Sequence, residues 1–215
     1  MDGRQVALRA GWDSACQLYG YLHGGGDLAA LPPGAVRLNP DEVAYGDALL
    51  GYARFYGTTA TYRQSSTFLF GSATFVAAGL AATAIANSSA RQRAQAQAQA
   101  AHQWRDQATV RTILTNQRLL CDYRGQWLSF WHQGVVEFQG DVAQWLFVLR
   151  YEVGDPVMLH GPAAPWFAVS IARLVYGPAG LHLPALAPLA RAVLEATRNQ
   201  RMLGGPPGPQ ALPPA

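Results

Sequence analysis

Apolar residues recur at helical spacing near the start of the chain. Over residues 5–22 they fall at positions i, i+4, i+7, i+8, i+11 and i+14, which places them on one face of an amphipathic helix. Three glycines, Gly24, Gly25 and Gly26, follow this pattern, and glycine commonly ends helices. We therefore expect a helix and a Gly- and Pro-rich linker to make up residues 1–40.

A shorter period replaces the helical one over residues 109–161. Short runs rich in β-branched and aromatic residues alternate there with turns that contain Gly, Asn or Asp. This spacing is typical of an antiparallel meander. The predicted strands cover residues 110–114, 118–123, 127–132, 135–138, 145–151 and 157–160.

The helical period returns after the last of these runs. Residues 163–177 show an apolar helical face that ends at a glycine. A second helix is expected over 184–203, within a C-terminal helical region at 178–203. The last residues, 204–215, are rich in Pro and Gly and predict a disordered tail.

Residues 41–62 admit two interpretations. A helix could begin here, because Asn39 is a good cap and Glu42 would complete a capping box. A strand is favoured by the apolar and aromatic positions between Val43 and Phe55, several of which share one parity. The sequence alone leaves both interpretations open.

The middle of the chain carries its longest apolar run. Residues 65–90 contain no charged side chain, and the apolar portion, 68–86, is close to the roughly 20 residues that a helix needs to cross a bilayer. An Ala- and Gln-rich stretch follows over 90–103, and both residue types favour helices. We therefore expect one long helix over 68–105, within an insertion at 65–105, whose apolar half needs a partner. The candidate membrane- or partner-contact residues are Phe68, Leu69, Phe70, Phe75, Val76, Leu80 and Ile85.

Composition narrows the class of protein. The chain has 215 residues, of which 50% are hydrophobic and 13% are charged, so it suits one folded domain better than a disordered chain. Two cysteines, Cys16 and Cys121, are too few for a disulfide scaffold or a zinc ribbon. The N-terminal sequence lacks the apolar core of a signal peptide, so we expect a cytoplasmic protein, with membrane association as a further option.

Little in the sequence indicates catalysis. The 16 basic residues are all arginine, which excludes a lysine nucleophile and a phosphate-binding loop of the Gly-Lys-Ser/Thr type. They are scattered, so we expect no nucleic-acid-binding surface. No two of the 5 histidines lie at the helical spacing of a metal pair, and the carboxylates are dispersed. We expect no enzyme activity, no metal or cofactor and no small-molecule substrate; an enzyme of unknown chemistry stays an alternative.

One run of residues resembles a known family. The sequence VRTILTNQRLLC, from Val110 to Cys121, resembles a signature of bacterial pleckstrin-homology and GRAM-like domains. The predicted strands and the helix at 163–177 follow it in the family's order. The resemblance implies an α+β, mainly β fold: a seven-stranded antiparallel barrel capped by a C-terminal helix. It would span residues 41–177, interrupted by the insertion at 65–105.

The resemblance also assigns structural roles to a few polar residues. The Thr-Asn-x-Arg motif resembles the family's structural turn, which implies that Arg118 pairs with a carboxylate and that Asn116 adopts the turn conformation. The sequence Asp-Glu-Val at 41–43 resembles the acidic start of the family's first strand. Three tryptophans are interpreted as core and barrel-edge packing, with an aromatic binding surface as the alternative: Trp127, Trp131 and Trp145.

The position of the insertion limits how it can meet a membrane. If 41–62 supplies the first strand, both sides of the insertion belong to one barrel, and a single crossing would place that barrel on both sides of a bilayer. Two crossings would have about ten apolar residues each, too few to span. The segment would then lie in the membrane interface or pack on protein. If 41–62 is not a strand, a single-pass anchor with residues 90–215 in the cytosol becomes possible.

The resemblance implies an interaction module, because bacterial members of the family are regarded as protein-binding or self-assembling. We therefore expect a non-catalytic scaffolding module that acts through 68–105, at a membrane surface or in a homo-oligomer. The alternative is a single-pass membrane-anchored protein with a cytosolic barrel. Arginines near the apolar run are candidates for contact with anionic headgroups. They are Arg54, Arg63, Arg91, Arg93 and Arg105.

Overall fold

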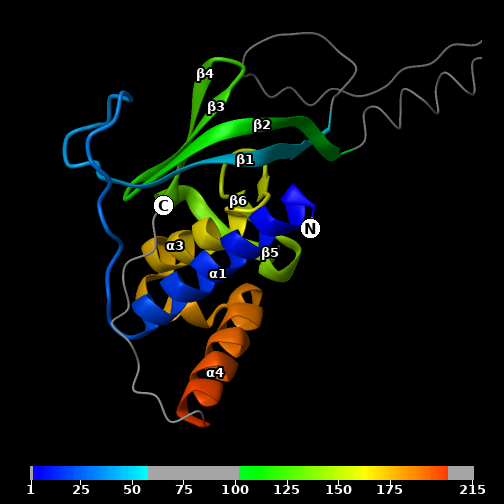
Figure 1. Ribbon diagram of the computed structural model, residues 1–215. Helices are drawn as coiled ribbons and strands as arrows, with labels where there is room; N and C mark the ends of the chain where they lie inside the picture. Colours follow the sequence, from blue (N-terminus) through cyan, green and yellow to red (C-terminus); the bar gives the residue numbers. More distant parts are fainter. Residues whose placement is uncertain (1, 58–101, 203–215) are drawn as a thin grey trace, which may run out of the picture. The chain divides into compact units, whose positions relative to one another are not determined.

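The computed structural model describes residues 2–57 and 102–202 (Figure 1). Strands form one curled antiparallel sheet in the order β4-β3-β2-β1-β7-β6-β5. The expected α+β, mainly β class is therefore confirmed. The strands are β1 (Ala44–Tyr56), β2 (Gln103–Thr115), β3 (Arg118–Tyr123), β4 (Gln126–Trp131), β5 (Val135–Asp141), β6 (Leu146–Tyr151) and β7 (Val157–His160).

Strand β1 resolves the ambiguous segment over Ala44–Tyr56, so the helix alternative is wrong for these residues. One Glu42 oxygen does accept a hydrogen bond from the Asn39 amide at 2.9 Å, as a capping box requires. No helix follows, because β1 lies inside the sheet between β2 and β7. Its alternation buries Leu50 and Tyr52, which a period of two places on the same face.

Strand β2 begins at Gln103, earlier than the predicted start at residue 110. The end of the helix predicted over 68–105 is therefore wrong. Trp104 explains the difference, because its ring packs against that of Phe55 on β1 with the centroids 5.2 Å apart. The rest of the predicted insertion lies outside the described residues.

Helix α1 (Gly3–His23) confirms the helix predicted near the N-terminus. The Asp2 carboxylate caps its start by accepting a hydrogen bond from the Arg4 amide, and Gly24 follows its end. Most of its first half is exposed, whereas four residues of its second half are buried. The buried residues are Ala15, Leu18, Tyr19 and Leu22.

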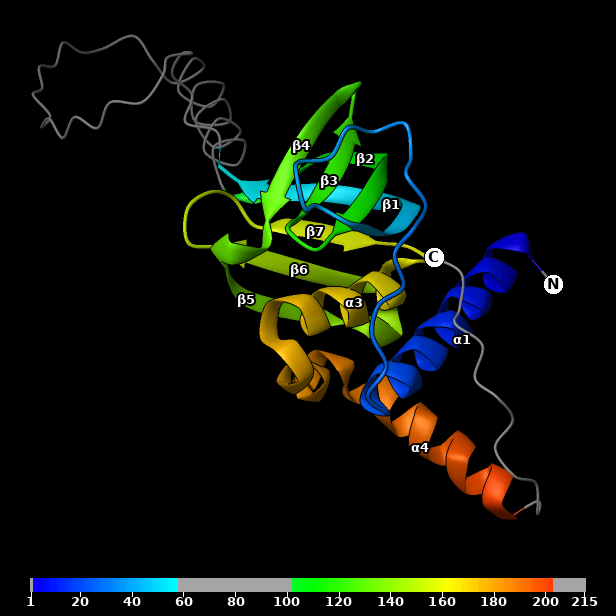
Figure 2. The same ribbon diagram turned by 90° about the vertical axis from the view of Figure 1, so that its left-hand side faces the viewer.

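Helix α3 (Ala164–Tyr176) is the apolar helix predicted after the last strand. Every residue from Ala164 to Ala172 is buried, and the helix lies along the sheet beside β6 (Figure 2). Gly46 on β1 permits close approach, since a Cβ there would come within 2.6 Å of the Trp166 ring. The core therefore fills the space between the curled sheet and this helix.

The last predicted helix is shorter than expected. Two 3-10 turns, η3 (Gly177–His182) and η4 (Pro184–Leu186), precede it, and α4 spans Ala187–Met202. Proline stands in the first turn of both short elements, where its missing N–H costs little. The first part of α4 contacts the C-terminal part of α1, and the two helices then diverge (Figure 2).

Contacts between distant segments tie α1 to the rest of the fold. The Trp145 indole Nε1 donates a hydrogen bond to the Leu8 carbonyl at 3.1 Å. The Tyr19 hydroxyl donates to the Leu181 carbonyl at 3.0 Å. Trp145 follows the short turn η2 (Val142–Gln144) and adopts a left-handed backbone conformation, with φ of 52°. Nothing in the sequence pattern indicated these pairings.

Candidate functional site

Most of the predicted contact residues lie outside the described residues. This holds for the whole apolar set of Phe68, Leu69, Phe70, Phe75, Val76, Leu80 and Ile85, and for Arg63, Arg91 and Arg93. The structure does describe Arg54, on β1, and Arg105, on β2. It also describes the two strand ends between which the insertion runs.

Those strand ends lie side by side. Strands β1 and β2 are neighbours in the sheet, and the Phe55 and Trp104 rings pack together near their ends. The chain therefore leaves the sheet after Tyr56 and returns to the same sheet at Gln103. Whatever residues 58–101 contact, they are attached at both ends to one folded unit.

Arg54 is engaged by a carboxylate. Its Nη2 lies 2.7 Å from Oδ2 of Asp155, in the turn between β6 and β7. The side chains are 32% and 39% exposed, so the pair is partly shielded from water. The candidate headgroup contact at Arg54 is thus already partnered within the fold.

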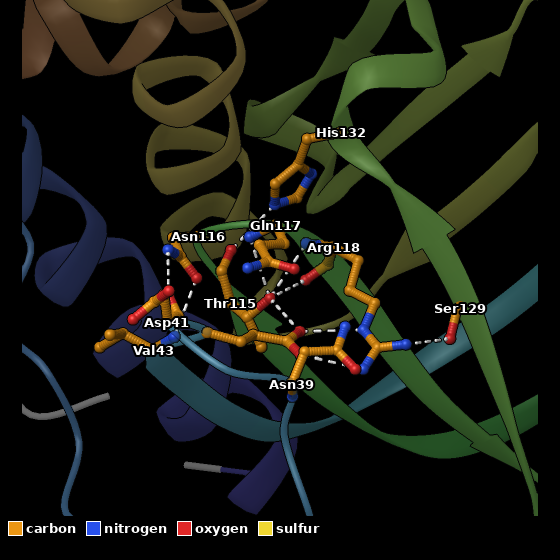
Figure 3. A network of polar contacts seen from close by, with 10 residues as sticks. Asn39, Asp41, Val43, Thr115, Asn116, Gln117, Arg118, Ser129 and His132 are labelled. Atoms are coloured by element: carbon orange, nitrogen blue, oxygen red, sulfur yellow. Dashed lines mark hydrogen bonds and ion pairs between the residues drawn. The ribbon is translucent and has the colours of Figure 1, made fainter.

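A buried ion pair joins Glu42, just before β1, to Arg118 at the start of β3 (Figure 3). Arg118 Nε donates to Glu42 Oε1 and Nη2 donates to Oε2, each at 2.9 Å, which is a bidentate arrangement. The Glu42 side chain is fully buried and that of Arg118 is 13% exposed. The interpretation that Arg118 pairs with a carboxylate is therefore confirmed, and the structure identifies that carboxylate as Glu42.

Further donors hold the Glu42 carboxylate in its ionised form. The Thr115 hydroxyl donates to Oε1 at 2.8 Å, and the Asn39 amide donates to Oε2 at 2.9 Å. Burial acts to raise the pKa of Glu42, but the hydrogen bonds from Arg118, Asn39 and Thr115 outweigh it and lower that pKa below its usual value. The carboxylate is therefore a structural anion that no longer has a free oxygen lone pair directed at solvent.

Asn116 fixes the chain that leads into β1. Its side-chain oxygen accepts from the Val43 amide at 2.8 Å, and its side-chain nitrogen donates to the Asp41 carbonyl at 3.0 Å. Its own amide donates to the Val43 carbonyl at 3.0 Å. Asn116 therefore serves as the turn residue that the resemblance implied, and it also holds the residues that lead into β1.

His132, which directly follows β4, joins the same network through Thr115. It begins the 3-10 turn η1 (His132–Gly134), and its Nε2 lies 2.9 Å from the Thr115 carbonyl, which can only accept. Nε2 therefore carries the proton. Burial lowers the pKa of His132, although the bond to Thr115 and the charge of Glu42 oppose that shift.

The tryptophans of β4 lie at an edge of the sheet. Trp127 and Trp131 are each 38% exposed, and β4 is the terminal strand in the sheet order. The Arg118 guanidinium stacks over the Trp131 ring, 4.6 Å from its centroid. Its Nη1 also donates to the Ser129 hydroxyl at 3.0 Å. These contacts extend the buried network to the edge strand.

The described residues show little of the chemistry of a reactive centre. No group of three or more His, Cys, Asp or Glu is placed to hold a metal within 2–57 and 102–202. Burial raises the pKa of Cys16 to about 11 and that of Cys121 to about 12, so both thiols are protonated at neutral pH. His23 and His182, far apart in sequence, bring their rings to 6.0 Å, a pairing that sequence spacing could not reveal.

No family model, curated protein or solved structure matches the chain. Of the helices within the described ranges, none is both long enough and apolar enough to cross a membrane.

Proposed function

We propose that the chain is a non-catalytic interaction module of the pleckstrin-homology/GRAM-like type. It acts at an anionic membrane surface through the segment between β1 and β2. The seven-stranded curled sheet, followed by the apolar helix α3, supports the family assignment, because the family's fold has the same two components in that order. The contact between Phe55 and Trp104 carries the functional proposal.

That contact argues against a single-pass anchor. Because β1 and β2 are neighbours in one sheet, a single crossing by the intervening segment would separate two paired strands. Two crossings would need about 40 apolar residues, and the run from 68 to 86 supplies less than half of them. The remaining way for this run to meet a bilayer is to enter the interface and return.

The charge of the same segment favours an anionic surface. Residues 57–102, between the two strands, contain Arg63, Arg91 and Arg93 but no Asp or Glu, which gives the segment a charge of +3. The whole chain also has a net charge of +3, so the rest of the chain is neutral overall. A basic flank beside an apolar run suits a membrane interface, where each arginine contributes about 1 kcal/mol near anionic lipids.

Vesicle flotation of the full chain tests the proposal. We expect it to float with vesicles of phosphatidylglycerol and phosphatidylcholine, and less with phosphatidylcholine alone. Leu80→Arg should abolish flotation, since it places a charge within the apolar run. Leu194→Arg is the matched control, because Leu194 is 69% exposed on α4 and the same substitution there should change nothing. Equal flotation of both variants would contradict the proposal.

Self-association is the second candidate, and the apolar run alone favours it.

A carbonate wash of membranes from native cells separates an interfacial contact from an embedded segment. It should release the protein if the contact is interfacial. If the wild-type chain does not float but Leu80→Arg lowers its mass in sedimentation, the partner is a second copy. Retention in the carbonate pellet would show an embedded segment and would contradict both candidates.

A further inference from the structure

The curled sheet encloses a cavity that none of the preceding roles uses. It has a volume of about 370 Å³, within the range of about 300–1,000 Å³ for small-molecule sites. Its walls come from β4, the turn η1, the turn between β6 and β7, and Arg54 on β1. The terminal strand of the sheet thus forms one side of the opening, and the β6–β7 turn forms the other.

Aromatic rings form the apolar walls. Phe130 and Tyr151 line the cavity with their ring centroids 6.1 Å apart, and Trp131 lies at its rim. Behind Phe130 lies the fully buried Tyr52, with centroids 6.1 Å apart. A flat apolar molecule would therefore meet ring faces and edges on more than one side.

Several buried polar atoms at this place have no protein partner within the described chain. They are the Tyr151 hydroxyl and Arg54 Nε, which belong to residues that line the cavity, and the hydroxyl of Tyr52 behind it. Burial raises the pKa of both tyrosines, so the hydroxyls stay protonated. All three atoms can therefore donate a hydrogen bond, and a buried donor without an acceptor destabilises a fold.

The ion pair at the cavity orients one of these donors, the Arg54 guanidinium. Asp155 binds Arg54 through Nη2, which leaves the Nε edge of the guanidinium for another acceptor. Asp155 also offsets the charge of Arg54, so the site needs an acceptor oxygen more than it needs a negative charge. We propose that the cavity binds a small aromatic molecule bearing a carbonyl or carboxylate oxygen, which accepts from the Tyr151 hydroxyl and Arg54 Nε.

The experiment titrates the full-length protein with three probes of one shape: phenylacetamide, phenylacetate and phenethylamine. Binding is followed by the NMR shift of the Trp131 indole N–H, assigned through a Trp131→Phe variant. We expect the amide and the acid to shift this signal at millimolar concentration, and the amine to leave it unchanged because it offers no acceptor. Binding of the amine as tight as that of the amide would overturn the proposal, as would the absence of any shift.

Tyr151→Phe separates a binding role from a structural one. We expect it to weaken binding of the amide about tenfold, because one hydrogen bond to the ligand is lost. The melting temperature should stay the same or rise, because the variant removes a buried hydroxyl without a partner. Tyr45→Phe is the control and should change neither quantity. Unchanged amide affinity in Tyr151→Phe would overturn the proposal. Leu80→Arg, which tests the membrane proposal, should bind the three probes as the wild type does, so the two tests are independent.

Discussion

At the scale of single residues, Glu42 and Arg118 hold together segments that are far apart in the sequence. The carboxylate accepts hydrogen bonds from Arg118, Thr115 and the Asn39 amide, and its side chain is fully buried. Desolvation of such a pair largely offsets its attraction, so its net contribution to stability is small. Removing only one partner is costly, because it leaves a buried charge without compensation.

Arg118→Ala should therefore lower the free energy of unfolding by about 3–5 kcal/mol. The loss exceeds that of a surface pair because Glu42 stays buried. Arg150→Ala is the control, since the Arg150–Glu137 pair is 54% and 48% exposed and should contribute less than about 1 kcal/mol. Urea denaturation of both variants measures the difference. Similar losses in the two variants would contradict a buried, structural role for Arg118.

His132 makes the same network sensitive to acid. Burial holds its folded-state pKa below the ordinary value of 6.5, so the unfolded chain takes up a proton first as the pH falls. The stability that the neutral imidazole contributes is thus complete above pH 6.5 and is lost as the pH falls toward the folded-state pKa. The pKa of Glu42 is also lowered, so the stability that its carboxylate contributes is likewise lost as the pH falls below about 4.5.

His132→Gln tests this pH dependence. The glutamine amide can still donate to the Thr115 carbonyl, but it does not titrate. The wild-type free energy of unfolding should fall from pH 6.5 toward pH 5, and the variant should lose less over that interval. Both proteins should lose stability below pH 4.5, because both retain Glu42. Parallel curves between pH 6.5 and 5 would show that His132 does not carry the effect.

At the scale of elements, close backbone approach decides where helices can dock. Gly11 on α1 faces the Pro162 carbonyl, and a Cβ at residue 11 would overlap that oxygen. Gly20 on the same helix has room, since its nearest neighbour would be Val193 Cγ1 at 3.5 Å. Replacing these two glycines with alanine should therefore change the stability of the protein differently, although helix propensity alone predicts the same change at both positions.

Gly11→Ala should destabilise the protein, and Gly20→Ala should stabilise it. Alanine at residue 20 removes conformational freedom from the unfolded chain and should raise the free energy of unfolding by about 0.5–1 kcal/mol. At residue 11 the steric overlap with the Pro162 carbonyl outweighs this gain, because α1 must move away from Pro162 to make room for the methyl group. Thermal unfolding measures both changes. Two increases of similar size would show that α1 does not pack against Pro162.

The elements also mark the limits of reasoning from sequence. The alternation of apolar residues and the turn residues between them located β3, β4, β6 and β7 within a few residues. Both signals are local, so they can be read from a short stretch of sequence. Strand β2 was predicted too short, since its start depends on Trp104 meeting Phe55. The choice of strand for 41–62 depends on pairing with β7 and β2, which no local pattern contains.

At the scale of the whole molecule, the site was only partly predictable. The turn roles of Asn116 and Arg118 followed from a short motif, but their partners, Asp41 and Glu42, are more than 70 residues away in the sequence. The cavity could not be predicted, because it forms where β4 meets the β6–β7 turn. The segment between β1 and β2 could be recognised from its composition, yet its attachment to adjacent strands follows only from the sheet order.

A shortened chain tests the central claim most directly. Residues 58–101 would be replaced by a short Asn-Gly turn, which suits neighbouring antiparallel strands. Because Phe55 and Trp104 already lie together, the variant should fold with no loss in free energy of unfolding; each halving of loop length lowers the closure cost by about 0.6 kcal/mol. It should also no longer float with anionic vesicles. Loss of folding, or flotation equal to that of the full chain, would contradict the account.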